Sequence, residues 1–125
     1  MGAFDLARGT SVILNIKDDG SCKLDTDLKV VAGKMSFSYD GKRVAYHVFS
    51  NPDQSLVTDF IEVPSDGYTS DVYVYNRSTR FKQQVTKNKT SNSMFPEFTR
   101  DGNVIFVDHP NDEAKKVHFV VIKPY

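Results

Sequence analysis

The sequence predicts an all-β chain built from repeated antiparallel hairpins. The first observation is an Asp-Gly pair, Asp40-Gly41, flanked by alternating apolar residues within Met35–Ser50. Such a pair is a strong hairpin signal because glycine accepts the positive φ that a tight turn demands. The second observation is that the same pattern recurs in Phe95–His109, around Asp101-Gly102. The third is that no segment has a persuasive helical period.

The remaining strands follow from runs of β-branched and aromatic residues that end at turn residues. Residues 1–10 show no clear period, although a short strand could include Phe4 and Leu6. Two later segments, Val104–Val107 and Val117–Ile122, are apolar on both faces, which is typical of strands in stacked sheets. About nine strands are expected: Ser11–Ile16, Ser21–Leu24, two in Met35–Ser50, Asp71–Asn76, Phe81–Thr86, two in Phe95–His109, and Val117–Ile122.

The strands repeat at a fixed spacing. The hairpin at Met35 recurs sixty positions later at Phe95, and Ser11–Ile16 recurs with Val12 matched to Val72. If the turn-rich segment 51–70 is an insertion, the period falls to the ~40–45 residues of a four-stranded propeller blade. We therefore expect about two to three blades of four-stranded antiparallel sheet. Their boundaries are 1–33 (partial), 34–93 (complete, with the insertion) and 94–125 (partial).

These residues resemble a known family. The segments FSYDGKRVAYH, SDVYVYNRSTRFKQQVT and FPEFTRDGNVIFV look like blades of TolB-like β-propellers, and also like the propellers of prolyl-oligopeptidase-type proteins. The resemblance extends from about Ser11 to Ile122. It departs from the family at Tyr39, where proline is usual, and at Thr99-Arg100. It implies a periplasmic or extracellular protein, although no signal peptide is visible. It leaves the function open because propellers serve many unrelated tasks.

Two or three blades do not close a ring, since closed propellers typically have four to eight. The last predicted strand ends in an apolar run that includes Val120 and Ile122, and its free edge invites pairing with another chain. Three arrangements are open. The chain is the C-terminal part of a longer propeller, or one subunit of a ring of several chains, either identical or different. Otherwise residues 1–10 supply the missing outer strand and a partner covers the open faces.

A partner-binding surface is therefore the main site that the sequence suggests. A long loop inside a compact domain is usually functional or specially packed. The insertion carries apolar residues that could anchor a partner as buried aromatics do at interfaces. The alternative is a loop that folds back on its own blade. The candidate partner-binding residues are Phe60, Ile61, Tyr68, Val120 and Ile122.

Candidate chemical groups have structural explanations. Cys22 is the only cysteine, so an internal disulfide is excluded, and a packed thiol is expected. His47 and His109 are expected to be strand-end histidines hydrogen-bonded to backbone, and His118 a core or interface residue. Asp71 should tie down a local turn. No metal-ligand spacing, cofactor motif or nucleophile elbow is present in the sequence.

The charged residues balance, with 16 basic and 16 acidic side chains. No global field therefore favours nucleic acid, and no run is long enough for a membrane span. The acidic residues are interpreted as solvated turn carboxylates, with Ca²⁺ ligands as the alternative: Asp18, Asp19, Asp25 and Asp27. The basic run is interpreted as solvated, with phosphate or an acidic partner as the alternative: Arg77, Arg80, Lys82, Lys87 and Lys89.

The sequence thus favours a non-catalytic protein-interaction or scaffold module, part of a larger assembly or a longer chain. The alternative is the propeller portion of an exported enzyme, a peptidase or a redox complex, whose catalytic residues lie elsewhere. A weaker alternative is a ligand or metal site in a central channel. No catalytic, cofactor or metal residues are assigned.

Overall fold

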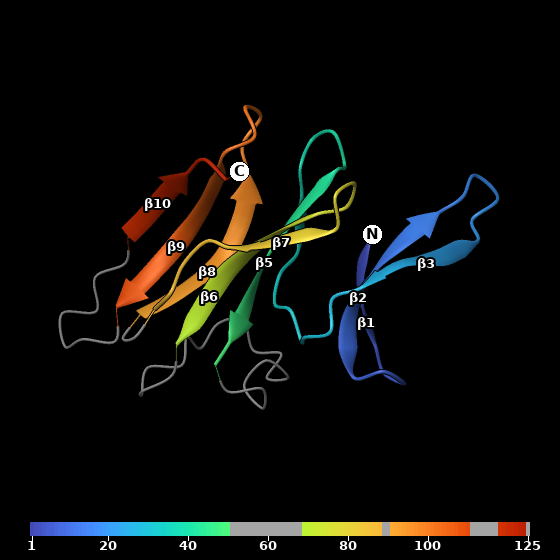
Figure 1. The fold of residues 1–125 in the computed structure, drawn as a ribbon, viewed down its shortest axis with the longest axis horizontal. Coiled ribbons are helices and arrows are strands. Elements are labelled where there is room, and N and C mark those ends of the chain that lie inside the picture. The colour runs from blue at the N-terminus through green and yellow to red at the C-terminus, as the bar shows by residue number, and fades with distance from the viewer. Residues whose placement is uncertain (51–68, 89–90, 111–117, 125) are drawn as a thin grey trace.

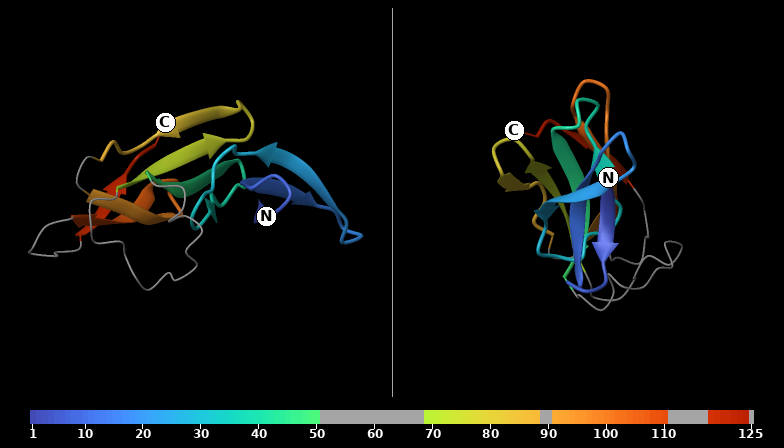
Figure 2. Two further views of the ribbon diagram at one scale, coloured as in Figure 1. Left: turned by 90° about the horizontal axis from the view of Figure 1, so that it is seen from below. Right: turned by 90° about the vertical axis from the view of Figure 1, so that its right-hand side faces the viewer.

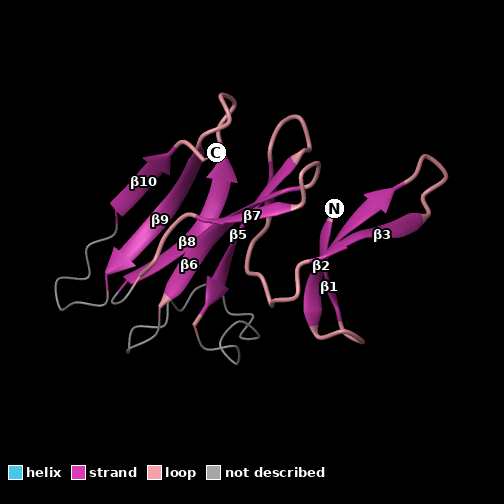
Figure 3. Ribbon diagram, viewed as in Figure 1, coloured by secondary structure: helices cyan, strands magenta, loops and turns pink. Residues whose placement is uncertain are grey.

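The computed structural model describes residues 1–50, 69–88, 91–110 and 118–124, together with their contacts. These residues form ten strands and no helix (Figure 3). None of them therefore belongs to a helix that could cross a membrane. The strands are β1 (Gly2–Asp5), β2 (Thr10–Ile16), β3 (Cys22–Asp27), β4 (Ser36–Phe37), β5 (Arg43–Phe49), β6 (Ser70–Asn76), β7 (Phe81–Gln84), β8 (Ser91–Phe98), β9 (Val104–Pro110) and β10 (His118–Ile122).

The strands fall into three antiparallel groups. The first is a separate sheet of order β1-β2-β3. The second, β4-β5-β6-β7, and the third, β8-β9-β10, share one strand ladder contact, a parallel bridge between Ser70 and Asn92. Figures 1 and 2 show the three groups following one another along the longest axis, with β1–β3 at one end and β8–β10 at the other. The expected all-β chain with an open stack of antiparallel units is confirmed.

Both Asp-Gly hairpins form where the sequence predicts them. Gly41 lies between β4 and β5 with φ of 69°, and Gly102 lies between β8 and β9 with φ of 86°. In the first turn the Asp40 carboxylate accepts hydrogen bonds from the Ser38 hydroxyl at 2.6 Å and the Lys42 amide at 3.0 Å. These bonds and the positive φ fix the turn, and with it the register of the strands that follow.

The groups stack through two apolar cores, one on each side of β5 and β6. Alternate residues of a strand point to opposite faces, so Val44 and Tyr46 face the first group while Ala45 and His47 face the third. One core joins the first group to the second through Ile13, Leu28, Val44, Tyr46 and Tyr75. The other joins the second group to the third through Ala45, Val72, Val74, Phe98, Val104 and Phe106. Phe98 is buried in the second core and Phe37 packs on the first.

The structure shifts the predicted alignment between β2 and β6 by one residue. The hydroxyl of Ser11 donates to the Ala32 carbonyl, and that of Ser70 donates to the Ser93 carbonyl in the corresponding place. Ser11 therefore corresponds to Ser70, and Ile13 rather than Val12 corresponds to Val72. The difference matters because a one-residue shift moves a side chain to the other face of the sheet. The first ten residues also contribute a full strand, β1, which pairs with β2 and not with the outer edge of β10.

The guanidinium group of Arg77 links the first group to the second through hydrogen bonds. Arg77 follows β6, and its side chain donates to the Asp25 carboxylate at 3.1 Å, the Gly41 carbonyl at 2.7 Å and the Asn15 side chain at 2.5 Å. Burial raises the pKa of Asp25, but the hydrogen bonds from Arg77 and Thr26 outweigh it and hold that pKa below its usual value. Part of the predicted solvated basic run is therefore structural.

We expect Arg77→Lys to destabilise the protein by about 1–3 kcal/mol, because an ammonium group cannot reproduce three fixed guanidinium contacts. Urea unfolding measures the loss, and hydrogen exchange should show that it is largest in β2 and β3. The matched control is Arg100→Lys at the exposed β8–β9 turn. Equal stability of the two variants would show that the Arg77 contacts contribute nothing.

Candidate interaction face at the open end of the stack

The last two strands divide their apolar residues between two faces. In the β9–β10 ladder, Val120 pairs with Phe106 and Ile122 with Val104, so these four side chains share one face. That face packs on the core between the second and third groups. The other face carries Phe119 paired with Val107, and Val121 paired with Ile105. We call these four residues, Ile105, Val107, Phe119 and Val121, the outer face.

The corresponding positions of the preceding group are covered. There, Val72 pairs with His47 and Val74 with Ala45, and all four side chains are between 0% and 2% exposed against the third group. At the matching places on the outer face, Phe119 is 76% exposed and Val121 is 56% exposed. The outer face therefore repeats the surface of β5 and β6 that packs on the third group, and no described residue covers it.

Strand β10 also leaves a backbone edge open. In the second group, β6 pairs with β5 on one side and with β7 on the other. Within the described residues β10 pairs with β9 alone, so the position that β7 takes in the second group has no strand in the third. Unpaired strand edges readily accept another strand, which is why natural proteins usually protect them. The open edge and the outer face lie on the same strand.

The sequence identified this strand but not the side chains that it exposes. Val120 and Ile122, named as candidate binding residues, are partly buried and pack on the core. Phe119 and Val121 were missed. The signal that could have found them is the period of two along the strand, combined with the matching positions Val72 and Val74. The other candidates, Phe60, Ile61 and Tyr68, lie outside the described residues.

The three histidines have different surroundings. His47 is 2% exposed, and its Nδ1 accepts a hydrogen bond from the Phe95 amide at 3.3 Å, as expected of a structural histidine. Val107 takes the corresponding place in the third group, because the Phe98–Val104 pair matches the Phe37–Val44 pair. His109 is partly buried, and its Nδ1 has no hydrogen-bond partner among the described residues. His118 is exposed at the start of β10, so the core role is wrong and only the interface role is left.

Acidic residues considered as candidate site residues form hydrogen bonds that stabilise the fold. Asp71 holds the segment after β7 rather than a local turn, because its carboxylate accepts bonds from the Thr86 hydroxyl at 2.7 Å and the Asn88 amide at 2.8 Å. Asp27 binds Thr10 and Lys29, contacts that lower its pKa to about 2. Among the described residues, no group of three or more His, Cys, Asp or Glu side chains could hold a metal. Cys22 is exposed, so its predicted packed position is wrong.

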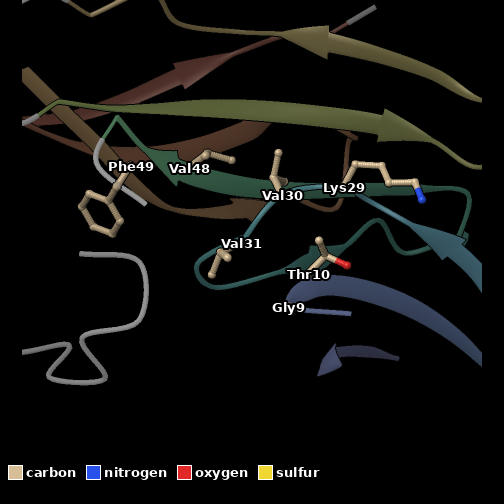
Figure 4. A pocket seen from close by; sticks show the side chains of 7 residues that line it. All are labelled: Gly9, Thr10, Lys29, Val30, Val31, Val48 and Phe49. Carbon is tan, nitrogen blue, oxygen red and sulfur yellow. The ribbon is translucent and has the colours of Figure 1, made fainter. Parts of the chain in front are cut away.

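A shallow pocket of about 270 Å³ lies between the first and second groups (Figure 4). Its apolar lining comes from Val30, Val31, Val48 and Phe49, and Lys29 contributes the only charged side chain among its lining residues. That charge is already paired with Asp27 at 3.1 Å. The pocket therefore offers an apolar wall without convergent polar groups, which does not resemble an active site.

The fold is similar to solved β-propellers. Over 98% of this chain and 26% of that chain it matches TolB from Acinetobacter baumannii, with 19% sequence identity and a TM-score of 0.59. The β-propeller domain of the Trilobed protease from Pyrococcus furiosus, described as having an open velcro topology, matches over 99% of this chain and 39% of that chain. Its identity is 13% and its TM-score 0.49. No protein-family model and no curated protein matches the sequence.

The likeness to TolB confirms the predicted β-propeller fold. Because the chain spans about a quarter of the TolB chain's length, it corresponds to a part of that propeller. The sheets do not close on themselves among the described residues, so the chain is a partial, open propeller of a few blades.

Proposed function

We propose that this chain is a non-catalytic protein-interaction module, and that the outer face and the free edge of β10 bind the polypeptide that continues the propeller. The observation that carries the proposal is the exposure of Phe119 and Val121 at positions that the preceding group buries. Val120 and Ile122 support the surface by holding β10 on the core, so that the outer face is presented on a rigid strand.

The energetics favour a covered outer face. Burying a phenylalanine or valine side chain contributes roughly 1.5–3 kcal/mol relative to leaving it in water. The partly exposed Ile105 and Val107 extend the same apolar face. The four side chains of the outer face are apolar, so a partner sheet can cover them without burying a charge, and Lys123 continues the same face only at the end of the strand.

The experiment is amine cross-linking of the protein in its source cells, analysed by mass spectrometry. Lys123 directly follows β10 and is exposed, which makes it a reporter for this surface. We expect Lys123 to cross-link to a second copy of the chain or to a polypeptide segment outside residues 1–125. The variant Phe119→Asp should lose these cross-links, because a carboxylate would have to be buried against the partner.

The matched control is Phe81→Asp on β7. Phe81 is also strongly exposed, at 61%, but lies on a different strand. Both variants replace an exposed phenylalanine, so both should unfold at temperatures close to that of the parent chain. Cross-links that survive in Phe119→Asp, or that disappear equally in both variants, would contradict the proposal.

A further inference from the structure

The opposite end of the stack has an uncovered apolar face as well. In the β2–β3 ladder, Leu14 pairs with Leu24 and Ile16 with Cys22, so these four residues share one face. Ile16 is 55% exposed and Leu24 is 40% exposed. We call these four residues, Leu14, Ile16, Cys22 and Leu24, the leading face. The reverse side of β2 carries Ile13, which is buried against the second group.

The leading face is the counterpart of a surface that is buried inside the molecule. Because Ser11 corresponds to Ser70, Leu14 corresponds to Tyr73 and Ile16 to Tyr75. Tyr73 and Tyr75 pack on the first group, the preceding one in the stack. The outer face corresponds instead to the side of the second group that packs on the third group. The two end faces therefore correspond to opposite sides of the contact that joins successive groups, and on the leading face only the part contributed by β6 and β10 has counterparts.

We propose that two copies of this chain associate head to tail, with the outer face of each copy packed on the leading face of the other. The inference rests on the proposed function and names the partner as a second copy. At each junction Phe119 and Val121 of one copy would meet Leu14 and Ile16 of the other, in the way that Val120 and Ile122 pack on the core that contains Val72 and Val74. The eight side chains that define the two end faces are uncharged at neutral pH, so a junction that leaves Lys123 at its edge buries no unpaired charge.

The number of sheets agrees with closure by two copies. The described residues of one chain form three antiparallel groups. Closed propellers typically have four to eight blades, so one copy is too few, two copies supply six, and three copies exceed that range. Among the described residues the first group has no counterpart of β4 and β8, whose Phe37 and Phe98 pack on the two cores, so a junction at the leading face would be formed mainly by β2 and β3. Such a contact is heterologous, and it closes when the rotation is complete.

Native mass spectrometry and light scattering test the proposal. The purified chain should have twice the 14.1 kDa mass of one copy. Phe119→Asp, on the outer face, and Ile16→Asp, on the leading face, should each shift the protein to single chains. Circular dichroism checks that both variants keep the β fold. The matched controls are Phe81→Asp and Leu6→Asp, which alter residues that are 61% and 88% exposed but lie off the two faces.

Mixing the two single-chain variants gives the sharpest test. Phe119→Asp retains an intact leading face and Ile16→Asp retains an intact outer face. A head-to-tail junction between these intact faces should restore a particle that contains one copy of each variant. Contact between two identical faces would give no mixed particle, because each variant would then pair only with itself or not at all. Absence of the mixed particle would overturn the proposal.

The outcome also separates this inference from the proposed function. A parent chain that stays single at every concentration, yet loses its Lys123 cross-links on Phe119→Asp, would overturn the second copy and leave the interaction module standing. A two-chain particle that persists in both aspartate variants would overturn the head-to-tail arrangement.

Discussion

Replacing Gly33 with alanine should destabilise the protein by about 1–3 kcal/mol, the usual cost of overpacking a core. A Cβ at position 33 would overlap the imidazole ring of His47. The ring has little freedom to move away, because Phe49 and Phe95 contact it edge-on with centroid separations of 5.3 and 5.4 Å. The Gly33 amide is also bound to the His47 carbonyl at 2.7 Å, so the two backbones cannot separate without losing that bond.

Urea unfolding of a double-mutant cycle measures this effect. On a His47→Ala background the overlap is gone, so Gly33→Ala should then cost little, with a coupling of about 0.5–3 kcal/mol between the two sites. The control is Gly2→Ala, whose Cβ would meet the flexible end of Met35. Additive effects of the two substitutions, or equal losses at positions 2 and 33, would refute steric overlap as the cause.

The sequence was sufficient for the fold because its signals are local. Asp40-Gly41 and Asp101-Gly102 determine two turns through glycine's positive φ, and the apolar runs on either side determine the strands. Their repetition predicts the stacking, since a sheet that is apolar on both faces needs a neighbour on each. Each hairpin signal lies within a single pair of neighbouring strands, so it can be recognised without knowing any distant contact.

What the sequence did not provide depends on contacts between distant residues. Arg77 was assigned to solvent because its role needs Asp25 and Asn15, which are 52 and 62 positions away. The exposure of Phe119 and the burial of Val120 depend on register, and an apolar run cannot reveal which of its residues face the core. Cys22 was expected to be packed from the average behaviour of cysteine, whereas it lies on an end face of the stack.

The buried histidine makes stability depend on pH. Burial lowers the pKa of His47 from 6.5 to about 4. Above pH 6.5 the imidazole is neutral in both the folded and unfolded states, so it adds no pH dependence. As the pH falls below 6.5, the unfolded chain binds the proton first and the folded state loses relative stability. The loss grows until the pH reaches the folded pKa, where it amounts to about 3 kcal/mol because one pKa unit corresponds to about 1.4 kcal/mol.

We therefore expect the free energy of unfolding to fall steadily between pH 6.5 and pH 4, and urea midpoints across this range measure it. Asp27, with its pKa lowered to about 2, loses its contribution at lower pH, which separates the two effects. The variant His47→Asn keeps an acceptor for the Phe95 amide but cannot titrate, so its stability should stay level through this window. His118→Asn, at an exposed position, should behave like the parent chain. Because His47 belongs to the face of β5 that meets the third group, a level profile in the parent chain would mean that this junction admits water and is looser than its packing implies.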